Sequence, residues 1–345
     1  MKHLVVCLLL VSGFLGAGPS AWATWKFIST GSGTAVGTPS CAQASTNHVV
    51  CAIRNGKSAI MVNEFNGTSW GTWTALVGAV SSDASCSSDG NGNVICAATA
   101  SAGGLLWSLF NGTTWTTPLQ FTASLFSTPS CANYTVGHVL CVARNASGGL
   151  AYTLYNGAKW SIIANLATTA ISQPSCTTDN NAGVICAVYT SAGATEVNRY
   201  TAGHWQGFLN IGGIAGGAPN CTSMNENGNV VCFAEGYISG IYGNRFKGPA
   251  WTTADWTGYS DSGLGGSVTE NASCTSQSAN KLVCGVMSVT DNAFYADVWN
   301  STSWSGWTKI GSSGTGSPSC APLGTGRVVC IFMGLKNQLT SVVGP

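Results

Sequence analysis

The sequence has few charged residues, and this scarcity limits the functions that it can support. Lys, Arg, Asp and Glu make up 7% of the 345 residues, and the formal net charge is +1. No basic patch or run of like charge supplies the phosphate neutralisation that drives nucleic-acid binding. The 12 acidic residues and 4 His also leave few groups for acid–base chemistry. We therefore expect no nucleic-acid partner and no cofactor.

Long apolar runs are absent beyond the N-terminus. Residues 1–23 combine a basic start, the apolar run VVCLLLVSGFLG and a small-x-small site at Ala21-Trp22-Ala23. This pattern predicts a signal peptide over 1–23. A lipoprotein anchor at Cys7 is disfavoured, because Val6 is large and little apolar chain precedes it. No later stretch approaches the ~20 apolar residues of a membrane helix. We expect a soluble product without a membrane span, secreted or periplasmic.

Cysteine is abundant, and its spacing divides the chain. Beyond Cys7, the first members of successive pairs recur at intervals of 45, 45, 45, 45, 53 and 46 residues. Self-similarity at a fixed period identifies a repeat architecture. The members of a pair are ten residues apart, or eleven in one case: Cys41 and Cys51, Cys86 and Cys96, Cys131 and Cys141, Cys176 and Cys186, Cys221 and Cys232, Cys274 and Cys284, Cys320 and Cys330.

A second marker keeps step with the cysteines. An aromatic residue is followed five positions later by Trp, as at Phe65 and Trp70, and in the fifth repeat at Phe246 and Trp251. That repeat carries seven extra residues, which we place in GYSDSGLGG. Each unit consists of four short segments joined by Asn-Gly and Gly-Asn turns, which are typical of tight hairpins.

Four antiparallel strands in each unit of about 46 residues predict a β-propeller. The fold class is therefore all-β, a seven-bladed propeller in one domain over 24–345. The repeats fall at approximately 38–82, 83–127, 128–172, 173–217, 218–270, 271–316, and 317–345 plus 24–37.

The two ends of this domain complete one another. Trp25 stands 16 residues before Cys41, as the hairpin Trp does in other repeats, so the mature chain begins with a fourth strand that has no third strand before it. After Cys330 the chain offers a third strand, QLTSVV, and no fourth. We predict that the N-terminal strand joins the C-terminal blade and closes the ring, which protects edges that would otherwise aggregate.

Each cysteine pair is predicted to form one disulfide per blade. The two cysteines lie on adjacent strands of a hairpin, where opposite residues approach the Cα separation of 5.5 Å that a disulfide favours. Seven such bonds indicate an oxidising compartment. Metal binding is disfavoured because a blade offers two ligands, whereas a structural zinc site needs four.

Two sets of residues are candidates for ligand contact. The hairpin aromatics suit stacking on sugars, but their regularity favours a packing role between blades. The residue seven positions before the hairpin Trp is polar in all six complete repeats, and it is either a ligand contact or a buried group bonded to the next blade. These residues are Asn63, Ser108, Thr153, Asn198, Asn244 and Asp297. Trp107 and Tyr152, one position earlier in their strands and facing the other way, are the aromatics to test first, with Trp256.

An enzyme is the weaker interpretation. A sialidase-like propeller needs three converging arginines, and only Arg54 and Arg144 occupy equivalent places in the repeats. The segment DGNGN at Asp89–Asn93 resembles the start of a calcium loop, but no Glu follows at the required position, which favours a hairpin turn.

The chain resembles the seven-bladed fucose-binding lectins secreted by bacteria, through Trp304-Ser305-Gly306-Trp307 and Gly311. Its FNGTSW hairpin is similar to the Y-D-G-x-x-W turn of six-bladed fungal fucose lectins. The resemblance implies binding of fucose or O-methylated sugars in clefts between blades. The Arg and Glu ligands of the fungal family are absent, since the position of its Glu holds Val62, Trp107, Tyr152, Val197, Gly243 and Ala296.

We therefore predict a secreted, multivalent carbohydrate-binding protein with glycans or glycoconjugates as partners, and we leave oligomerisation open. The alternatives are a protein-interaction or adhesion ring and, less favoured, a glycoside hydrolase. The predicted ligand-binding residues are Trp107, Tyr152, Trp256, Asn63, Asn198, Asn244 and Asp297.

Overall fold

The structure is a computed structural model in which the described residues form β-strands joined by turns and irregular loops. It describes residues 25–76, 78–213, 217–226, 228–236, 240–248, 250–259, 263–265, 272–288 and 290–345. The predicted signal peptide, 1–23, lies outside these residues. Two short 3-10 turns, Thr253–Asp255 and Leu335–Asn337, lie among the strands. No helix in this part of the chain is long and apolar enough to cross a membrane.

The strands form antiparallel sheets, and most sheets contain four consecutive strands. The first contains β2 (Ser40–Ser45), β3 (His48–Arg54), β4 (Ile60–Phe65) and β5 (Thr74–Ala75). The second contains β6 (Ser85–Ser88), β7 (Val94–Thr99), β8 (Leu105–Phe110) and β9 (Leu119–Phe121). The third contains β10 (Ser130–Thr135), β11 (His138–Arg144), β12 (Leu150–Tyr155) and β13 (Ala164–Leu166).

The next two sheets repeat this order with small variations. One contains β14 (Ser175–Thr178), β15 (Gly183–Tyr189), β16 (Thr195–Thr201), β17 (His204–Trp205) and β18 (Leu209–Asn210), where both β17 and β18 pair with β16. The other contains β19 (Asn220–Ser223), β20 (Val230–Glu235), β21 (Ile241–Phe246) and β22 (Gly263–Gly265).

The remaining strands form one seven-stranded sheet, because a single long strand serves two units. The N-terminal part of β26 (Thr308–Pro322) pairs with β25 (Ala293–Trp299), and its C-terminal part pairs with β27 (Val328–Gly334). The other members are β23 (Ser273–Ser278), β24 (Lys281–Met287), β28 (Gln338–Gly344) and β1 (Lys26–Thr34).

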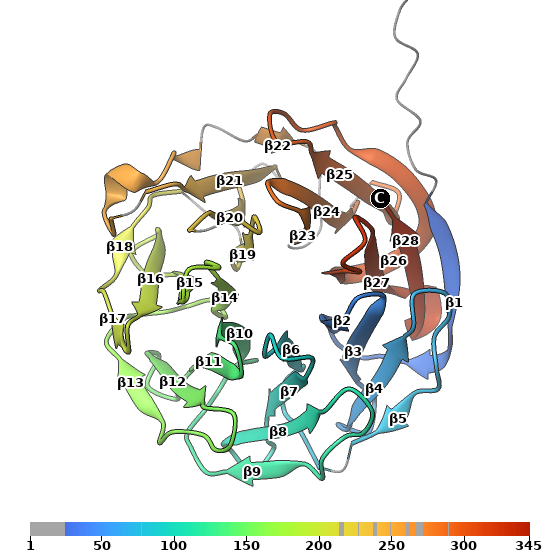
Figure 1. Ribbon diagram of the computed structural model, residues 1–345, viewed down its shortest axis with the longest axis horizontal. Coiled ribbons are helices and arrows are strands. Elements are labelled where there is room, and N and C mark those ends of the chain that lie inside the picture. Colours follow the sequence, from blue (N-terminus) through green and yellow to red (C-terminus); the bar gives the residue numbers. More distant parts are fainter. Residues whose placement is uncertain are drawn as a thin grey trace, which may run out of the picture.

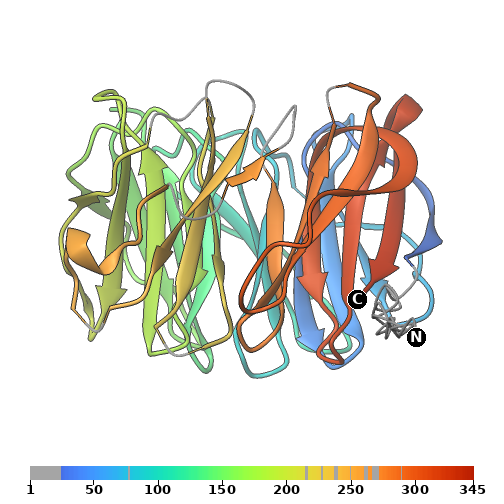
Figure 2. The same cartoon turned by 90° about the horizontal axis from the view of Figure 1, so that it is seen from above.

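The sheets surround a common centre, with β2, β6, β10, β14, β19 and β23 innermost (Figure 1). Seen from the side they stand as a short cylinder (Figure 2). The first and last described strands lie side by side, since Lys26 of β1 pairs with Val343 of β28 and Ser29 pairs with Thr340. This is the pairing predicted for the two ends of the chain, and β1 covers the edge that β28 would otherwise expose.

The second strand of each unit carries most of the core. In β3, five consecutive residues, Val49–Ile53, are buried, and β7 is buried along its whole length. Such continuous apolar runs form strands that are covered on both faces. Hydrophobic clusters accordingly combine residues of two successive sheets, and one of them joins Ile331 and Val343 of the last unit with Val49 and Phe65 of the first. Packing between sheets therefore continues across the chain ends.

The cysteines of each pair face one another in the first hairpin of their unit and form the seven predicted disulfides. The bonds join Cys41 to Cys51, Cys86 to Cys96, Cys131 to Cys141, Cys176 to Cys186, Cys221 to Cys232, Cys274 to Cys284 and Cys320 to Cys330.

One detail of these disulfides differs from the expectation. The Cα atoms of the paired cysteines are 3.9–4.1 Å apart, closer than the expected 5.5 Å. This distance is nearer to that of a non-hydrogen-bonded antiparallel pair, whose side chains approach more closely. The second cysteines, which lie on the central strands of the core, are almost fully buried, with exposed fractions of 4% or less: Cys51, Cys96, Cys141, Cys186, Cys232, Cys284 and Cys330. The second cysteines therefore have a structural role in the core.

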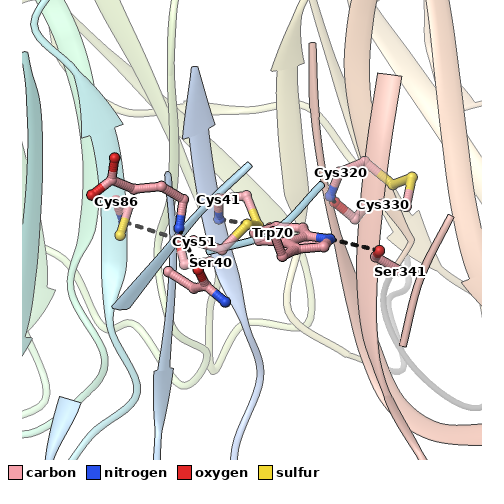
Figure 3. Close-up of a disulfide and its surroundings, with 12 residues drawn as sticks. Ser40, Cys41, Cys51, Trp70, Cys86, Cys320, Cys330 and Ser341 are labelled. Carbon is pink, nitrogen blue, oxygen red and sulfur yellow. Dashed lines mark hydrogen bonds between the residues drawn. A yellow bond between two sulfur atoms is a disulfide. The ribbon is translucent and has the colours of Figure 1, made fainter. Parts of the chain in front are cut away.

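The Ser before the first cysteine links neighbouring units. Figure 3 shows Ser40 beside Cys86, whose backbone N–H donates to Ser40 Oγ at 2.9 Å. The same bond joins Cys131 to Ser85, Cys176 to Ser130, Cys221 to Ser175, Cys320 to Ser273 and, across the chain ends, Cys41 to Ser319. The repeated Ser-Cys dipeptide therefore connects the inner strands as well as supplying the disulfide.

A candidate binding cleft between the second and third sheets

A cavity of about 1040 Å³ lies between the second and third sheets, and we call it the open cleft. One wall consists of Trp107 and residues 119–125 of the second sheet. The other consists of residues 145–147, 158–163 and 165 with Ala151 of the third sheet. Its rim is exposed to solvent, with Leu119 55% and Ile162 90% exposed.

Three aromatic side chains form a continuous run in this cleft. The Trp107 ring meets the Trp160 ring edge to face, with centroids 5.7 Å apart, and the Phe121 ring centroid lies 6.1 Å from that of Trp160. Strand pairing fixes their positions, because Trp107 pairs with Leu119 and Phe121 with Leu105. Trp107, a predicted ligand residue, is therefore in the wall of a cleft between sheets.

The polar groups of the open cleft are neutral except for one. Lys159 is the only charged residue among those that line it. Asn145 Nδ2 donates to Asn165 Oδ1 at 3.1 Å, and Asn145 Oδ1 accepts from Ser147 Oγ at 2.7 Å, which orders one wall. On the opposite wall, Gln120 Nε2 donates to the Gly103 carbonyl at 2.8 Å. Aromatic faces with ordered amides and hydroxyls suit a neutral, hydroxylated ligand.

The corresponding cleft at the chain ends, between β28–β1 and β4–β5, is filled, and we call it the closing cleft. Trp70, the counterpart of Trp160, donates from Nε1 to Ser341 Oγ at 2.8 Å (Figure 3). Trp73 stacks on Trp70 with centroids 6.5 Å apart and donates to the Thr30 carbonyl at 2.9 Å. Ser341 occupies the repeat position of Trp107, so a small polar residue there accompanies a closed interface.

Tyr152 has the environment of Trp107, one sheet further on. Its ring lies 5.5 Å from that of Trp205 and 6.1 Å from that of Tyr200, and it packs in the cluster between the third and fourth sheets. Burial, with smaller contributions from Tyr134 and Tyr152, raises the pKa of the Tyr200 hydroxyl. The clefts therefore share a plan while differing in side chains.

The four polar residues that the sequence suggested as ligand contacts are buried, which favours the alternative role, a buried group hydrogen-bonded to neighbouring strands. Their exposed fractions are between 1% and 2%: Asn63, Asn198, Asn244 and Asp297. Asn244 Nδ2 donates to the Ile211 carbonyl of the preceding sheet at 3.2 Å, and its Oδ1 accepts from Gly258 N–H at 2.9 Å. Asn63 similarly donates to the Gly71 carbonyl. The side chains connect strands and sheets and offer no surface to a ligand.

Trp256 is also buried, at 7% exposure, and is not an exposed platform. It forms the bridge to Phe246 that the hairpin Trp forms in other sheets, a role that the spacing had assigned to Trp251. Trp251 instead donates to the Gly207 carbonyl of the preceding sheet at 2.9 Å. Most of the fifth repeat's extra residues therefore precede Trp256, rather than falling in GYSDSGLGG.

The arginines considered for an enzyme site have separate structural partners. Arg54 Nε donates to Asp83 Oδ1 at 2.9 Å, whereas Arg144 lies over the Phe126 ring and donates to the Ile171 carbonyl at 3.3 Å. Asp89, in DGNGN, accepts from Asn91 and Asn93 within a hairpin turn. Among the residues described, no group of three His, Cys, Asp or Glu side chains could hold a metal ion.

Cavities of about 590 and 390 Å³ lie at the two ends of the innermost strands. Neutral polar groups dominate both linings, and Asp83 is the only charged residue that lines the smaller one. Several amides at the larger one are already engaged: Asn180 donates to Ser223 Oγ at 2.7 Å and Gln277 to the Gly326 carbonyl at 2.9 Å. These groups hold the turns in place, so the open cleft is the stronger candidate.

Sequence reasoning missed Phe121 and the two exposed apolar residues of the rim. The sequence did contain a signal that could have identified Phe121. This residue stands six positions after the hairpin Trp of its repeat, Trp115. At this position other repeats have aliphatic residues, namely Leu76, Leu166, Ile211 and Ile310. An aromatic residue there, together with Trp107 one strand away, distinguishes the second sheet.

No protein-family model matches the sequence, and a search of curated proteins finds no similar one. Solved structures do resemble the chain. A lectin from Burkholderia pseudomallei, BP39L, is 14% identical with a TM-score of 0.74, over 90% of this chain and 97% of that one. A fungal lectin from Aleuria aurantia, described as a six-bladed β-propeller with a novel fucose recognition mode, is 13% identical with a TM-score of 0.54, over 79% and 93%.

The same Aleuria aurantia lectin as an N-to-Q variant in complex with α-methyl-L-fucoside is 11% identical with a TM-score of 0.56, over 80% of this chain and 96% of that one. At these identities the likeness establishes the fold. The chain is all-β, with sheets arranged as in a β-propeller.

Proposed function

We propose that this protein is an exported, seven-bladed β-propeller lectin that binds glycans in the open cleft. The observation that carries the proposal is the cleft itself, in which three aromatic rings adjoin ordered amides and hydroxyls with a single charge. Sugars present an apolar face and several hydroxyl groups, which such a surface matches. Similarity to solved lectins, including one in complex with a fucoside, supports the same proposal.

The blade number and the export route belong to the proposal as well. Seven disulfide-bonded hairpins and seven clusters between successive units support seven blades in one domain over 24–345. Seven disulfides are also consistent with export to an oxidising compartment by a signal peptide that is cleaved after Ala23. Tyr152, which packs between the third and fourth sheets, is the second aromatic residue to test. Fucose and O-methylated sugars are the first ligands to test.

A glycan array on oxidised protein covering 24–345 tests the function. Selective binding of glycans supports the proposal. A blank array at high protein concentration overturns it and favours the alternative of a protein-binding ring.

Substitution then tests the site. Trp107→Ala should weaken binding about tenfold or more, because truncating a central Trp contact costs about 2 kcal/mol or more and about 1.4 kcal/mol already corresponds to tenfold. Phe126→Ala is the matched control, since Phe126 is 71% exposed and does not line the cleft. Equal affinity of both variants, with unchanged melting temperatures, would remove the open cleft as the site.

A further inference from the structure

We infer that the open cleft takes an extended neutral oligosaccharide along several sugar units, rather than a single terminal sugar. This inference rests on the proposed glycan-binding function and concerns the class of ligand. It follows from the size of the cleft, the length of its apolar strip, the distribution of its polar groups and its charge.

The cleft is larger than one sugar ring requires. Its volume of about 1040 Å³ reaches the upper end of the range, about 300–1,000 Å³, of pockets that enclose a whole drug-sized molecule. Both walls are made of long segments, residues 119–125 on one side and 158–163 on the other. A single sugar would leave most of these walls in contact with water.

The apolar strip is longer than one aromatic platform. Trp160 lies between Phe121 and Trp107, so the three rings are successive positions for stacking. Leu119 and Ile162 extend the strip to the rim, where both are largely exposed. Large apolar side chains that cluster at an exposed rim mark a contact surface rather than scattered surface residues. The strip thus offers contacts to more than one sugar ring.

The polar groups lie on both walls. Gln120, Thr122 and Ser124 belong to the second-sheet wall, and the linked amides Asn145 and Asn165 belong to the third-sheet wall. A chain of sugars has hydroxyl groups along both edges, which this arrangement can bind.

The residues that line the cleft carry too little positive charge to favour an acidic ligand. No arginine lines the cleft, and Lys159 is exposed at its edge. Lys159 also lies next to the hairpin turn, where its backbone N–H donates to Asn156 Oδ1. A polyanion would need several cations, so the ligand class is neutral.

The test is titration calorimetry with probes of increasing length. Methyl α-L-fucoside, 2′-fucosyllactose and cello-, manno- and chito-oligosaccharides from one to about six units are compared on the oxidised protein. We expect the Kd to fall about tenfold or more between the single sugar and the longest bound member of its series. Leu119→Ser should weaken the longer ligand about threefold or more, and by a larger factor than it weakens the single sugar.

Val136→Ser is the matched control for Leu119→Ser, because Val136 is 68% exposed and does not line the cleft. The same Kd for single sugars and longer chains would overturn the inference while leaving the lectin proposal intact. The same holds if Leu119→Ser and Val136→Ser have equal effects. Absence of binding to every probe and to a full glycan array would overturn both.

Discussion

The open cleft and the closing cleft have the same strands in the same order and opposite contents. In the open cleft Trp107 stands beside Trp160, whose buried Nε1 has no hydrogen-bond partner among the described residues. In the closing cleft Ser341 accepts from Trp70, and Trp73 stacks on Trp70. One backbone plan therefore gives an interface for stability and an interface with room for a ligand, depending on a few side chains.

The strongest way to break this comparison is to remove the strand that makes the closing cleft. A chain that starts at residue 35 lacks β1, exposes the edge of β28 and loses Ile28 from the cluster between last and first sheets. We expect loss of the cooperative thermal transition and aggregation, because an unpaired edge is a template for association. A chain that starts at residue 24 is the control. A cooperative melt within a few degrees of that control would show that closure is dispensable.

A smaller change empties the closing cleft without cutting the chain. Trp73→Ala removes the ring stacked on Trp70 together with its bond to the Thr30 carbonyl. We expect the free energy of unfolding to fall by about 3 kcal/mol, the lower end for large aromatic truncations, because Trp73 is partly exposed. Ile163→Ala, at the same repeat position in the open cleft, should cost about 1 kcal/mol, because Ile163 is only partly buried and lines an open cavity. Denaturant titration of both variants measures the difference, and equal losses would contradict the proposed contrast.

The spacing of Cys and Trp was sufficient to predict the hairpin disulfides and the pairing of the two chain ends, because these depend on strand order alone. Spacing could not place the fifth repeat correctly. Trp251 and Trp256 both stand near the turn, and both rings lie 5.4 Å from that of Phe246. Only the backbone pairing in the structure shows that Trp256 forms the bridge.

The role of the polar positions could not be decided from the sequence for a different reason. Alternation along a strand tells which residues share a face, but in this fold the neighbouring sheets cover both faces. Asn63 and Asn244 are therefore buried together with their aromatic neighbours. Trp107 lines the open cleft, and its role in ligand binding stays a prediction. The room beside it depends on side-chain volumes in two sheets that no single repeat encodes.

One of these buried polar positions holds a carboxyl group, that of Asp297. Its titration should make the stability of the protein depend on pH, which the Asn residues at the equivalent positions cannot do. Burial raises the pKa of Asp297, and hydrogen bonds from Ser305 Oγ and Val298 N–H only partly oppose it. Its Oδ2 has no hydrogen-bond partner among the described residues. A raised native pKa means that the native state is favoured at low pH, and this advantage is lost as pH rises from about 3.9 through the raised value.

Asp297→Asn places the residue found at Asn63 and Asn244 in this position. We expect the variant to be more stable than the parent at pH 7 by about 1 kcal/mol. The gain should disappear below about pH 3.9, where the carboxyl is protonated in both states. Melting temperatures measured across pH test this expectation.

Asp291→Asn is a control of opposite sign. Lys309 lowers the pKa of Asp291 to about 2, so the contribution of Asp291 to stability is present above about pH 3.9 and is lost as pH falls toward 2. A gain from Asp297→Asn that is independent of pH would contradict the assignment.

The smallest expected effect concerns a single hydrogen bond, that from Trp70 Nε1 to Ser341 Oγ. Trp70→Phe and Trp160→Phe remove the same atoms from equivalent positions of the two clefts, so their costs in lost volume are similar. Only Trp70 loses a hydrogen bond, that from its Nε1 to Ser341 Oγ. We expect Trp70→Phe to cost about 1 kcal/mol more than Trp160→Phe in denaturant titration.

A double-mutant cycle assigns this difference to the hydrogen bond. Ser341 Oγ also donates to the Ile28 carbonyl at 2.7 Å, so Ser341→Ala alone removes two bonds, whereas Trp70→Phe removes one. The coupling energy of Trp70→Phe with Ser341→Ala should therefore equal about 1 kcal/mol, the part that they share. Combining Trp160→Phe with Ser341→Ala should give additive costs, because the two residues belong to different clefts. Additivity in both cycles would mean that the bond to Trp70 contributes nothing to closing the chain, and ring stacking by Trp73 would then account for the closed cleft.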